Sequence, residues 1–398
     1  MSRDAAHQVD TVSRRKYLLT LTAAGAAGLA GCSGQTNSGS GGSGTSAGED
    51  ESGGSGGSGD DTNDENGGSS APATVTAEGS STVYPISNKG SSYWNSNSPA
   101  SDGEYWGSND ESTVPGWDEI ETDQNIADYF AGLYGFEPTG ERSNPPFATR
   151  VALSHSGTGC EAVRDGLVDI GNSSGPITAE LDISEEQRDE NYVDHVVGRD
   201  GQPVFVSQAI YDAGVEQLTG EQIRGIYQGD ITNWSEVGGP DQEIYVVGRA
   251  EGCGTDTSFR LNMLGDADAP MEVDTRLGQN QQVQQVLQDN DNAIGYMALA
   301  FSGSGIQAIA IDFEGTVFRP DPDAENTIFD SEYPLNRDLH MYTRITEDTP
   351  EGTDMREAAF LNMFLTDFGQ QVFVEDVNYI TLPTSDIEAE RAKLPDQA

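Results

Sequence analysis

The chain has 398 residues, of which 67 are Asp or Glu and 20 are Lys or Arg, so its formal net charge is -47. A field of this sign repels nucleic acid and anionic lipid surfaces, and both are excluded as partners. The only lysines are Lys16, Lys89 and Lys393, and the acids are spread along the whole chain. Near 1 M salt the Debye length is about 3 Å, which screens such a surface. The composition therefore indicates a protein of high-salt surroundings.

The N-terminal residues 1–31 predict an export signal. Paired arginines, Arg14 and Arg15, precede the mildly apolar run Leu18 to Gly31, which is too short to span a bilayer unaided. The pair resembles a twin-arginine signal, and the four residues ending at Cys32 (Leu-Ala-Gly-Cys) resemble a lipobox. We expect export by the twin-arginine route and a lipid on Cys32 that anchors the protein to the outer face of the cell membrane. A buried helix with a chance cysteine is the alternative.

Residues 32–71 are predicted to form a flexible tether. From Ser33 to Ala71 the chain is mostly Gly, Ser, Asp, Glu, Asn and Thr with no large apolar side chain, so burial cannot offset the entropy of ordering. A flexible coil of this length has an end-to-end distance of roughly 35 Å. The following domain could therefore swing above a membrane.

After Ala71, short apolar runs alternate with amphipathic helices, which is typical of an α/β fold. The capping-box residues Thr219 to Gln222 precede Ile223, Ile226 and Tyr227 on one helical face. The other predicted elements are strands at Ala73–Ala77, around Val151 and at Ile244–Val247, helices near Glu161–Gly166 and over Gln281–Asp289, and a helical stripe of Phe360, Phe364 and Phe368. We assign these apolar stripes to core packing.

Residues 91–146 are predicted to be an insertion. Four aromatic residues, Trp94, Tyr105, Trp106 and Trp117, stand among Ser, Asn, Asp, Gly and Pro. We interpret the segment as a long surface excursion with one short helix near Gln124–Tyr134. A folded part of roughly 320 residues favours two domains over one core.

Three turns combine hydroxyls and free amides at predicted helix N-termini, where anions bind. The first is Ser80-Ser81-Thr82-Val83, the second Ser156-Gly157-Thr158-Gly159, and the third Gly254-Thr255. Each follows a predicted strand. Ordinary helix caps would explain any one of these turns alone, but three are harder to dismiss.

Arg249 precedes the third turn and adds a full positive charge. Glu251, two residues on, could fix the guanidinium so that it points at an oxyanion. A solvated surface arginine is the alternative.

The order and spacing of seven segments resemble the substrate-binding protein of the high-affinity phosphate ABC transporter. The likeness runs from about Ala73 to Pro383, apart from residues 91–146. The segments are Gly79–Thr82, Ser156–Gly159, Asp169–Pro176, Ile231–Trp234, Arg249–Thr255, Ala293–Tyr296 and Tyr333–Arg337.

The resemblance implies a type II periplasmic-binding fold with two α/β lobes, each a mixed sheet flanked by helices, a hinge and a ligand cleft at the strand carboxyl ends. Residues 72–203 and 332–398 would form the first lobe, and residues 204–331 the second. It also implies inorganic phosphate as ligand, a membrane permease as partner, no cofactor, and a monomer. The implied ligand residues are Ser81, Thr82, Val83, Ser156, Gly157, Thr158, Gly159, Ser174, Arg249, Cys253, Gly254 and Thr255, with Glu251 in support.

Two residues depart from the family pattern. Ser174 stands where a well-studied branch has Asp to accept the proton of monohydrogen phosphate, so discrimination by protonation is in question. Cys253 stands where a serine is usual, and a thiol is a weak donor. Because the resemblance places Cys160 and Cys253 on opposite lips of one cleft in an oxidising compartment, we consider a disulfide or redox latch, against two small residues that merely fit.

The sequence offers little for catalysis or metal binding. His155 beside Ser154 and Ser156 is the one tempting nucleophile site, and the four histidines have no metal-ligand spacing. We therefore expect no enzyme, although a phosphatase derived from this fold is the alternative. Other candidate ligands are sulfate, molybdate and tungstate, and a sensor for a membrane kinase is a third class.

Overall fold

The computed structural model describes residues 73–99, 102, 122–303, 305–350 and 352–398. The predicted signal, Cys32 and the tether lie outside these residues, as do Tyr105, Trp106 and Trp117 of the insertion. Residues 71–398 form one compact unit. None of the helices in the described ranges is both long enough and apolar enough to cross a membrane.

The first sheet is mixed and has five strands. Two parallel neighbours flank β1, and β13 runs antiparallel to both of its neighbours. In order across the sheet the strands are β2 (Thr149–Leu153), β1 (Val75–Gly79), β3 (Ile170–Ser173), β13 (Arg337–Arg344) and β4 (Tyr192–Asp200).

The second sheet is also mixed. A small third sheet is formed by strands from the same part of the sequence. The second has the order β10 (Ile306–Ala308), β5 (Val204–Ser207), β9 (Ala293–Tyr296), β7 (Tyr245–Arg249) and β8 (Thr275–Leu277). The third has the order β12 (Thr316–Phe318), β11 (Ala310–Phe313) and β6 (Gln217–Thr219). The strands of the first sheet lie within residues 72–203 and 332–398, and those of the other two within 204–331. The mixed α/β fold class is thus confirmed, while the lobe boundaries stay a prediction.

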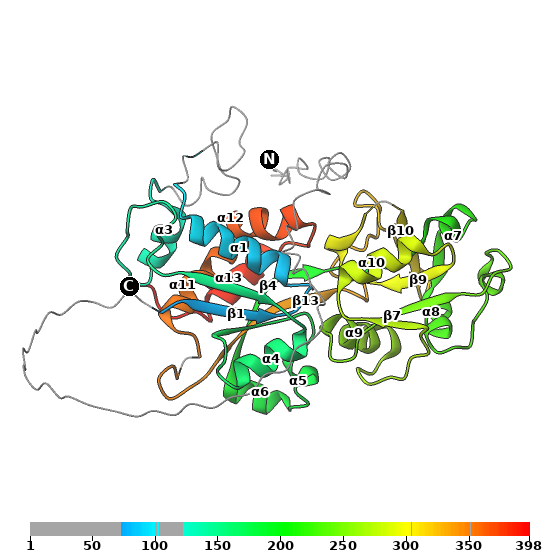
Figure 1. Ribbon diagram of the computed structural model, residues 1–398, viewed down its shortest axis with the longest axis horizontal. Helices are drawn as coiled ribbons and strands as arrows, with labels where there is room; N and C mark the ends of the chain where they lie inside the picture. Colours follow the sequence, from blue (N-terminus) through cyan, green and yellow to red (C-terminus); the bar gives the residue numbers. More distant parts are fainter. Residues whose placement is uncertain (1–72, 100–101, 103–121, 304, 351) are drawn as a thin grey trace, which may run out of the picture. The chain divides into compact units, whose positions relative to one another are not determined.

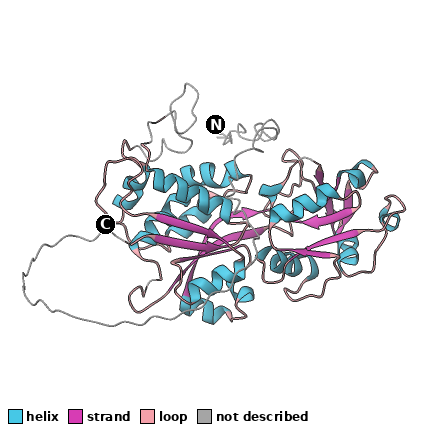
Figure 2. Ribbon diagram, viewed as in Figure 1, coloured by secondary structure: helices cyan, strands magenta, loops and turns pink. Residues whose placement is uncertain are grey.

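Helices cover both faces of the first sheet (Figures 1 and 2). On one side lie α1 (Tyr84–Ser96), α11 (Met355–Phe364) and α12 (Asp367–Gly369), and on the other α4 (Ser156–Arg164), α5 (Ile177–Glu180) and α6 (Glu185–Asn191). The remaining helices are α3 (Ile126–Gly132), α7 (Gln208–Asp212), α8 (Gly220–Tyr227), α9 (Gly254–Phe259), α10 (Asn280–Asp289) and α13 (Thr384–Arg391). Short 3₁₀ turns span Trp234–Val237, Leu299–Phe301 and Glu375–Val377, and π-helical turns span Arg260–Leu264 and Gln370–Val374.

The predicted start of α8 is confirmed. The Thr219 hydroxyl accepts from the Gln222 amide at 3.1 Å, and the Gln222 side chain accepts from the Thr219 amide at 2.8 Å. These two bonds satisfy donors that a helix start leaves free. The apolar face that follows is buried, as are Phe360, Phe364 and Phe368.

Two predictions about elements were wrong. Helix α4 begins at Ser156 rather than near Glu161, so the glycine-rich turn is itself its first turn. Trp94 does not belong to a surface excursion, because it is fully buried in α1 and donates its indole N–H to the Phe147 carbonyl at 2.7 Å. Its polar sequence neighbours concealed this core position.

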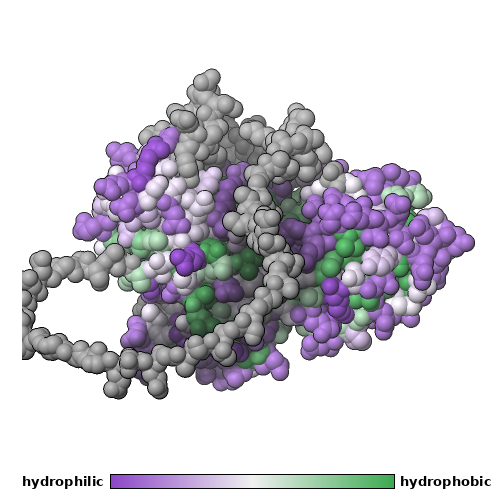
Figure 3. Space-filling view, in the orientation of Figure 1, coloured by the Kyte–Doolittle hydropathy of each residue, from purple (hydrophilic) through white to green (hydrophobic). Residues whose placement is uncertain are grey.

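The face in view in Figure 3 is largely hydrophilic, with hydrophobic residues in smaller patches. Among the described residues, the large apolar side chains that are exposed are Leu153, Leu167, Leu261 and Met355. This surface agrees with the acidic composition.

Candidate functional site

The predicted turns all stand at the carboxyl ends of strands. Strand β1 leads into the Ser80–Val83 turn, β2 into α4, β3 into Ser174, and β7 into α9. Gly79 must be glycine, because its φ is +141° and a Cβ there would lie 2.1 Å from the Asn172 carbonyl oxygen. This close approach of β1 to β3 positions the first turn.

The first turn presents two hydroxyls to the rest of the site. The Ser81 hydroxyl accepts from Arg249 Nη2 at 3.4 Å, and the Thr82 hydroxyl lies 3.1 Å from that of Thr255. The Val83 amide instead lies 3.4 Å from the Ser80 hydroxyl of its own turn. Ser81 therefore meets Arg249 of the second sheet, Thr82 meets Thr255 of α9, and Val83 is held within the turn.

Ser156 and Ser174 form a second group of hydroxyls. The Ser156 hydroxyl accepts from the Ser174 amide at 3.1 Å and lies 3.4 Å from the Ser174 hydroxyl, which in turn accepts from Ser80 at 3.0 Å. A Cβ at Gly254 would lie 2.2 Å from the Ser156 hydroxyl oxygen. The turns before α4, after β3 and before α9 thus meet at one place.

Three residues of the second turn contribute less than predicted. Thr158 is exposed, so its side chain does not join the cluster. The Gly159 amide donates to the His155 carbonyl at 2.9 Å as a helical bond, and the Gly157 amide donates to the Gly252 carbonyl at 3.3 Å. These amides already have partners within the protein.

Arg249 ends β7 and is fully buried. Its Nε donates to the Leu277 carbonyl at 3.1 Å, and its Nη2 donates to the Gly278 carbonyl at 2.8 Å. Its Nη1 donates to the side-chain oxygen of Asn280, the first residue of α10. Two carbonyls and an amide therefore aim the guanidinium toward the first turn, where it reaches Ser81.

The predicted role of Glu251 is wrong. Its side chain is 75% exposed and its nearest cation is Arg260, at 3.6 Å. Glu251 stands in the turn between β7 and α9, and no contact with Arg249 is found among the described residues. The neutral groups around Arg249 take the bracing role.

Cys160 and Cys253 do not form the disulfide that the sequence left possible, since both are free, buried thiols. Cys160 packs in an apolar cluster with Val163, Ile177 and Tyr342, and burial raises the pKa of its thiol. Cys253 lies against Arg249 instead, with its sulfur 3.1 Å from Nη2. The two thiols therefore have different surroundings.

Sequence reasoning missed Arg337, which joins the turns from the first residue of β13. Its Nη2 lies 2.6 Å from an Asp200 carboxylate oxygen, 3.3 Å from the Thr82 hydroxyl and 3.2 Å from the Thr255 hydroxyl. Its Nη1 donates to the Ser174 carbonyl at 3.3 Å and the Gly254 carbonyl at 3.2 Å. The segment Tyr333–Arg337 was the available signal, but only strand pairing shows where Arg337 points.

Asn280 was missed for the same reason. Its side-chain amide donates to the Ser81 and Thr82 hydroxyls at 3.3 and 3.4 Å. It is fully buried at the start of α10, which lies far from both serine-rich turns in the sequence. Asn280 therefore bridges Arg249 and the first turn.

The site also contains a buried carboxyl, Glu180 on α5. Both of its oxygens are buried, and one lies 2.8 Å from the place that a Cβ of Gly175 would take. Burial raises the pKa of Glu180 to about 8. Near neutral pH this carboxyl is therefore largely protonated and adds little negative charge to the site.

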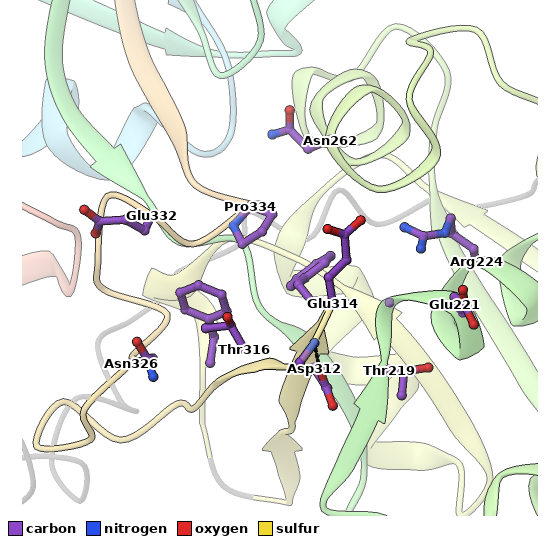
Figure 4. Close-up of a pocket in the computed structure, with 14 residues that line it drawn as sticks. Thr219, Glu221, Arg224, Asn262, Asp312, Glu314, Thr316, Asn326, Glu332 and Pro334 are labelled. Atoms are coloured by element: carbon purple, nitrogen blue, oxygen red, sulfur yellow. Dashed lines mark hydrogen bonds between the residues drawn. The ribbon is translucent and has the colours of Figure 1, made fainter.

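A separate cavity of about 860 Å³ lies between α8, β11 and the loop before β13 (Figure 4). Glu221, Asp312, Glu314 and Glu332 line it, with Arg224 as the basic residue among its lining. Its net negative charge is unsuited to an anion. Within the described ranges, no three His, Cys, Asp or Glu side chains are grouped so as to hold a metal ion.

Comparison with known proteins places the chain in a family. The PBP superfamily domain matches residues 134–367. The phosphate-binding protein PstS of Bacillus subtilis is 31% identical over 253 residues, which are 62% of this chain and 75% of that protein. PstS of Staphylococcus saprophyticus is 26% identical over 263 residues, 64% of this chain and 78% of that protein.

Solved structures share the fold. A putative phosphate ABC transporter substrate-binding protein with bound phosphate from Clostridium perfringens aligns with a TM-score of 0.54 at 20% identity, over 78% of this chain and 100% of that chain. An ABC-type phosphate transport receptor from Vibrio cholerae aligns with a TM-score of 0.50 at 22% identity, over the same shares. The chain therefore belongs to the PBP superfamily, within the family of the phosphate-binding protein PstS.

Proposed function

We propose that this protein binds inorganic phosphate outside the cell membrane and delivers it to the permease of an ABC transporter. The names of its relatives support the ligand. The transport role is supported by the description of the Clostridium perfringens structure as a putative phosphate ABC transporter substrate-binding protein. One observation carries the proposal for this chain: Arg249 is fully buried, and among the described residues no carboxylate lies within ion-pair distance of it. A buried cation without an anion is costly, and an oxyanion would complete it.

The surrounding groups suit a tetrahedral oxyanion. A hydroxyl both donates and accepts, so it can exchange a hydrogen bond within the protein for one to a ligand. The hydroxyls that can do so are those of Ser81, Thr82, Ser156 and Thr255. Arg249 would add a charge-assisted, two-pronged contact. Arg337 and Asp200 neutralise each other, so the pair of arginines leaves about one net positive charge for the ligand.

Ser174 bears on the selectivity of the site among oxyanions. Ser174, in place of a carboxylate, supplies a hydroxyl that can donate as well as accept. A fully deprotonated ion such as sulfate would therefore meet no fixed acceptor at that position. Sulfate, molybdate or tungstate is the second candidate ligand for this reason.

The remaining parts of the proposal concern the whole chain. We propose export by the twin-arginine route, a lipid on Cys32, and life in high salt, as the sequence indicates. The protein would act as a monomer without catalysis, with residues 72–203 and 332–398 as one lobe and residues 204–331 as the other. Ligand contacts from both lobes would close the hinge between them.

The test is calorimetric titration of the protein in high salt with phosphate, sulfate, molybdate and tungstate in turn. We expect phosphate to bind and Arg249→Gln to weaken binding by about 2–4 kcal/mol. Arg150→Gln is the matched control, since Arg150 is exposed on β2. Unchanged affinity in Arg249→Gln would refute the assignment of the binding site. Tight binding of another oxyanion in place of phosphate would show that this oxyanion is the ligand.

A further inference from the structure

The two buried arginines of the site differ in their counter-ions. Arg337 has Asp200, with 2.6 Å between Nη2 and the carboxylate oxygen. The guanidinium of Arg249 contacts two backbone carbonyls, the Asn280 amide and the Ser81 hydroxyl, which are all neutral. Among the described residues, its further hydrogen-bond contact is with the sulfur of Cys253, at 3.1 Å.

Cys253 is thus the single acidic side chain in hydrogen-bond contact with the guanidinium of Arg249 within the described ranges. Cys253 is only 3% exposed, and it is the residue directly before α9. A charge buried without a partner is costly, and a neighbouring group that can ionise relieves that cost. The Arg249–Cys253 pair therefore has a physical reason to become an ion pair.

We propose that the Cys253 thiolate is the internal counter-ion of Arg249 and that the bound anion displaces it. This inference rests on the proposed function, because it assigns the regulation of the same site. When the oxyanion binds, the sulfur loses its pairing with the guanidinium and takes up one proton from solvent. No bond other than S–H forms, and no electron is transferred.

The other groups that face Cys253 agree with this role. Burial raises the pKa of the thiol, but Arg249, a hydrogen bond with His155 and the amides of Thr255 and Asp256 outweigh it and lower the pKa to about 7. The hydrogen bond with Cys253 raises the pKa of His155 in turn. The nearby carboxyl of Glu180 opposes ionisation of the thiol, but burial keeps Glu180 largely protonated near neutral pH.

The exchange makes phosphate affinity depend on pH. The binding-competent fraction is the fraction with a protonated thiol, which is about one tenth at pH 8 and about nine tenths at pH 6 for a midpoint near 7. Cys253→Ser removes the competing charge. The ratio of the wild-type to the variant dissociation constant should therefore rise about tenfold from pH 6 to pH 8, and the ionisation of phosphate itself cancels in that ratio.

The direct test follows the thiolate by its ultraviolet absorbance in the full chain carrying Cys32→Ser and Cys160→Ala, so that Cys253 is the one remaining thiol. Without phosphate we expect a titration midpoint near neutral pH. Saturating phosphate at pH 8 should remove the thiolate signal, and calorimetry in buffers of different ionisation enthalpy should show close to one proton taken up per phosphate. A thiol that stays protonated to pH 9 would overturn the proposal.

Arg249→Gln in the same background is the matched control. Measured without phosphate, the titration midpoint of the Cys253 thiol should lie at higher pH in this variant. This result does not depend on whether the protein binds phosphate. If the protein binds no phosphate, the proposed function fails. The ion pair is still tested, because it is supported only if the titration midpoint of Cys253 is higher in Arg249→Gln. If phosphate binds and the thiolate signal persists, the displacement is wrong and the proposed function stands.

Discussion

Arg337 and Asp200 form a nearly fully buried ion pair, with side-chain exposures of 4% and 0%. The same guanidinium contacts Thr82 from the first turn and Thr255 from the start of α9. Such a pair is seldom a large source of stability, but removing one member leaves a buried charge alone. Arg337 therefore matters because its removal would leave the buried carboxylate of Asp200 without an opposite charge.

We expect Arg337→Gln to lower the free energy of unfolding by about 3–5 kcal/mol, because Asp200 would keep its buried charge without a partner. Denaturant unfolding in high salt measures the change. Asp200→Asn with Arg337→Gln removes both charges and should be less destabilised than the sum of the two single changes. Additive losses would show that the two residues do not act as an ion pair.

Glu180 makes stability fall as the pH rises. The usual pKa of its carboxyl is 4.5, and burial raises it to about 8 in the folded protein. Between these values the folded protein holds a proton that the unfolded chain has released, so the free energy of unfolding declines with pH. Below about 4.5 both states are protonated and this contribution is constant.

Glu180→Gln should therefore gain stability relative to wild type from pH 5 to pH 8, on the order of a few kcal/mol. Denaturant unfolding at several pH values measures the difference. The exposed Glu161→Gln is the matched control and should follow the wild-type curve. Parallel curves for Glu180→Gln would mean that this carboxyl is ionised in the folded protein.

At the scale of elements, the sequence predicted those whose signals are local. The Thr219 cap and the apolar faces of α8 and α10 follow from spacing alone. The start of α4 did not, because Gly157 and Gly159 have low helix propensity and the first turn is held by packing against the sheet. Arg337 lies in the site because of how β13 pairs in the sheet, and Asn280 because of where α10 packs. No local sequence pattern predicts either arrangement.

The packing of α4 gives a test at this scale. A Cβ on Gly159 would lie 2.6 Å from the Glu78 carbonyl oxygen and 2.7 Å from the Gly79 Cα, both backbone atoms. Gly159→Ala should therefore push α4 from β1 and lower the free energy of unfolding by about 1–3 kcal/mol, and weaken phosphate binding through Ser156. Thermal and denaturant unfolding measure the first effect.

Gly132→Ala is the matched control, since nothing lies within 4 Å of its added methyl group at the end of α3. It should be neutral or stabilise the fold by up to about 1 kcal/mol. Equal effects of the two substitutions would contradict the close approach of α4 to β1.

At the scale of the whole molecule, we expect the net charge of -47 to limit stability at low salt. Like charges on one surface oppose compaction, and salt screens them over about 10 Å at 0.1 M and about 3 Å at 1 M. The melting temperature should therefore rise steeply with KCl over this range. A melting temperature that is independent of salt would show that the acidic surface does not limit folding.

The same charge predicts an unusual salt dependence of ligand capture. The overall field repels phosphate, whereas Arg249 and the hydroxyls act only at contact distance inside a buried site, where screening is weak. Raising KCl from about 0.1 to 1 M should therefore speed association and leave dissociation nearly unchanged, so that affinity increases. Stopped-flow binding kinetics separate the two rates. Slower association at high salt would mean that a local positive field steers the anion, and Arg249→Gln would then abolish the effect.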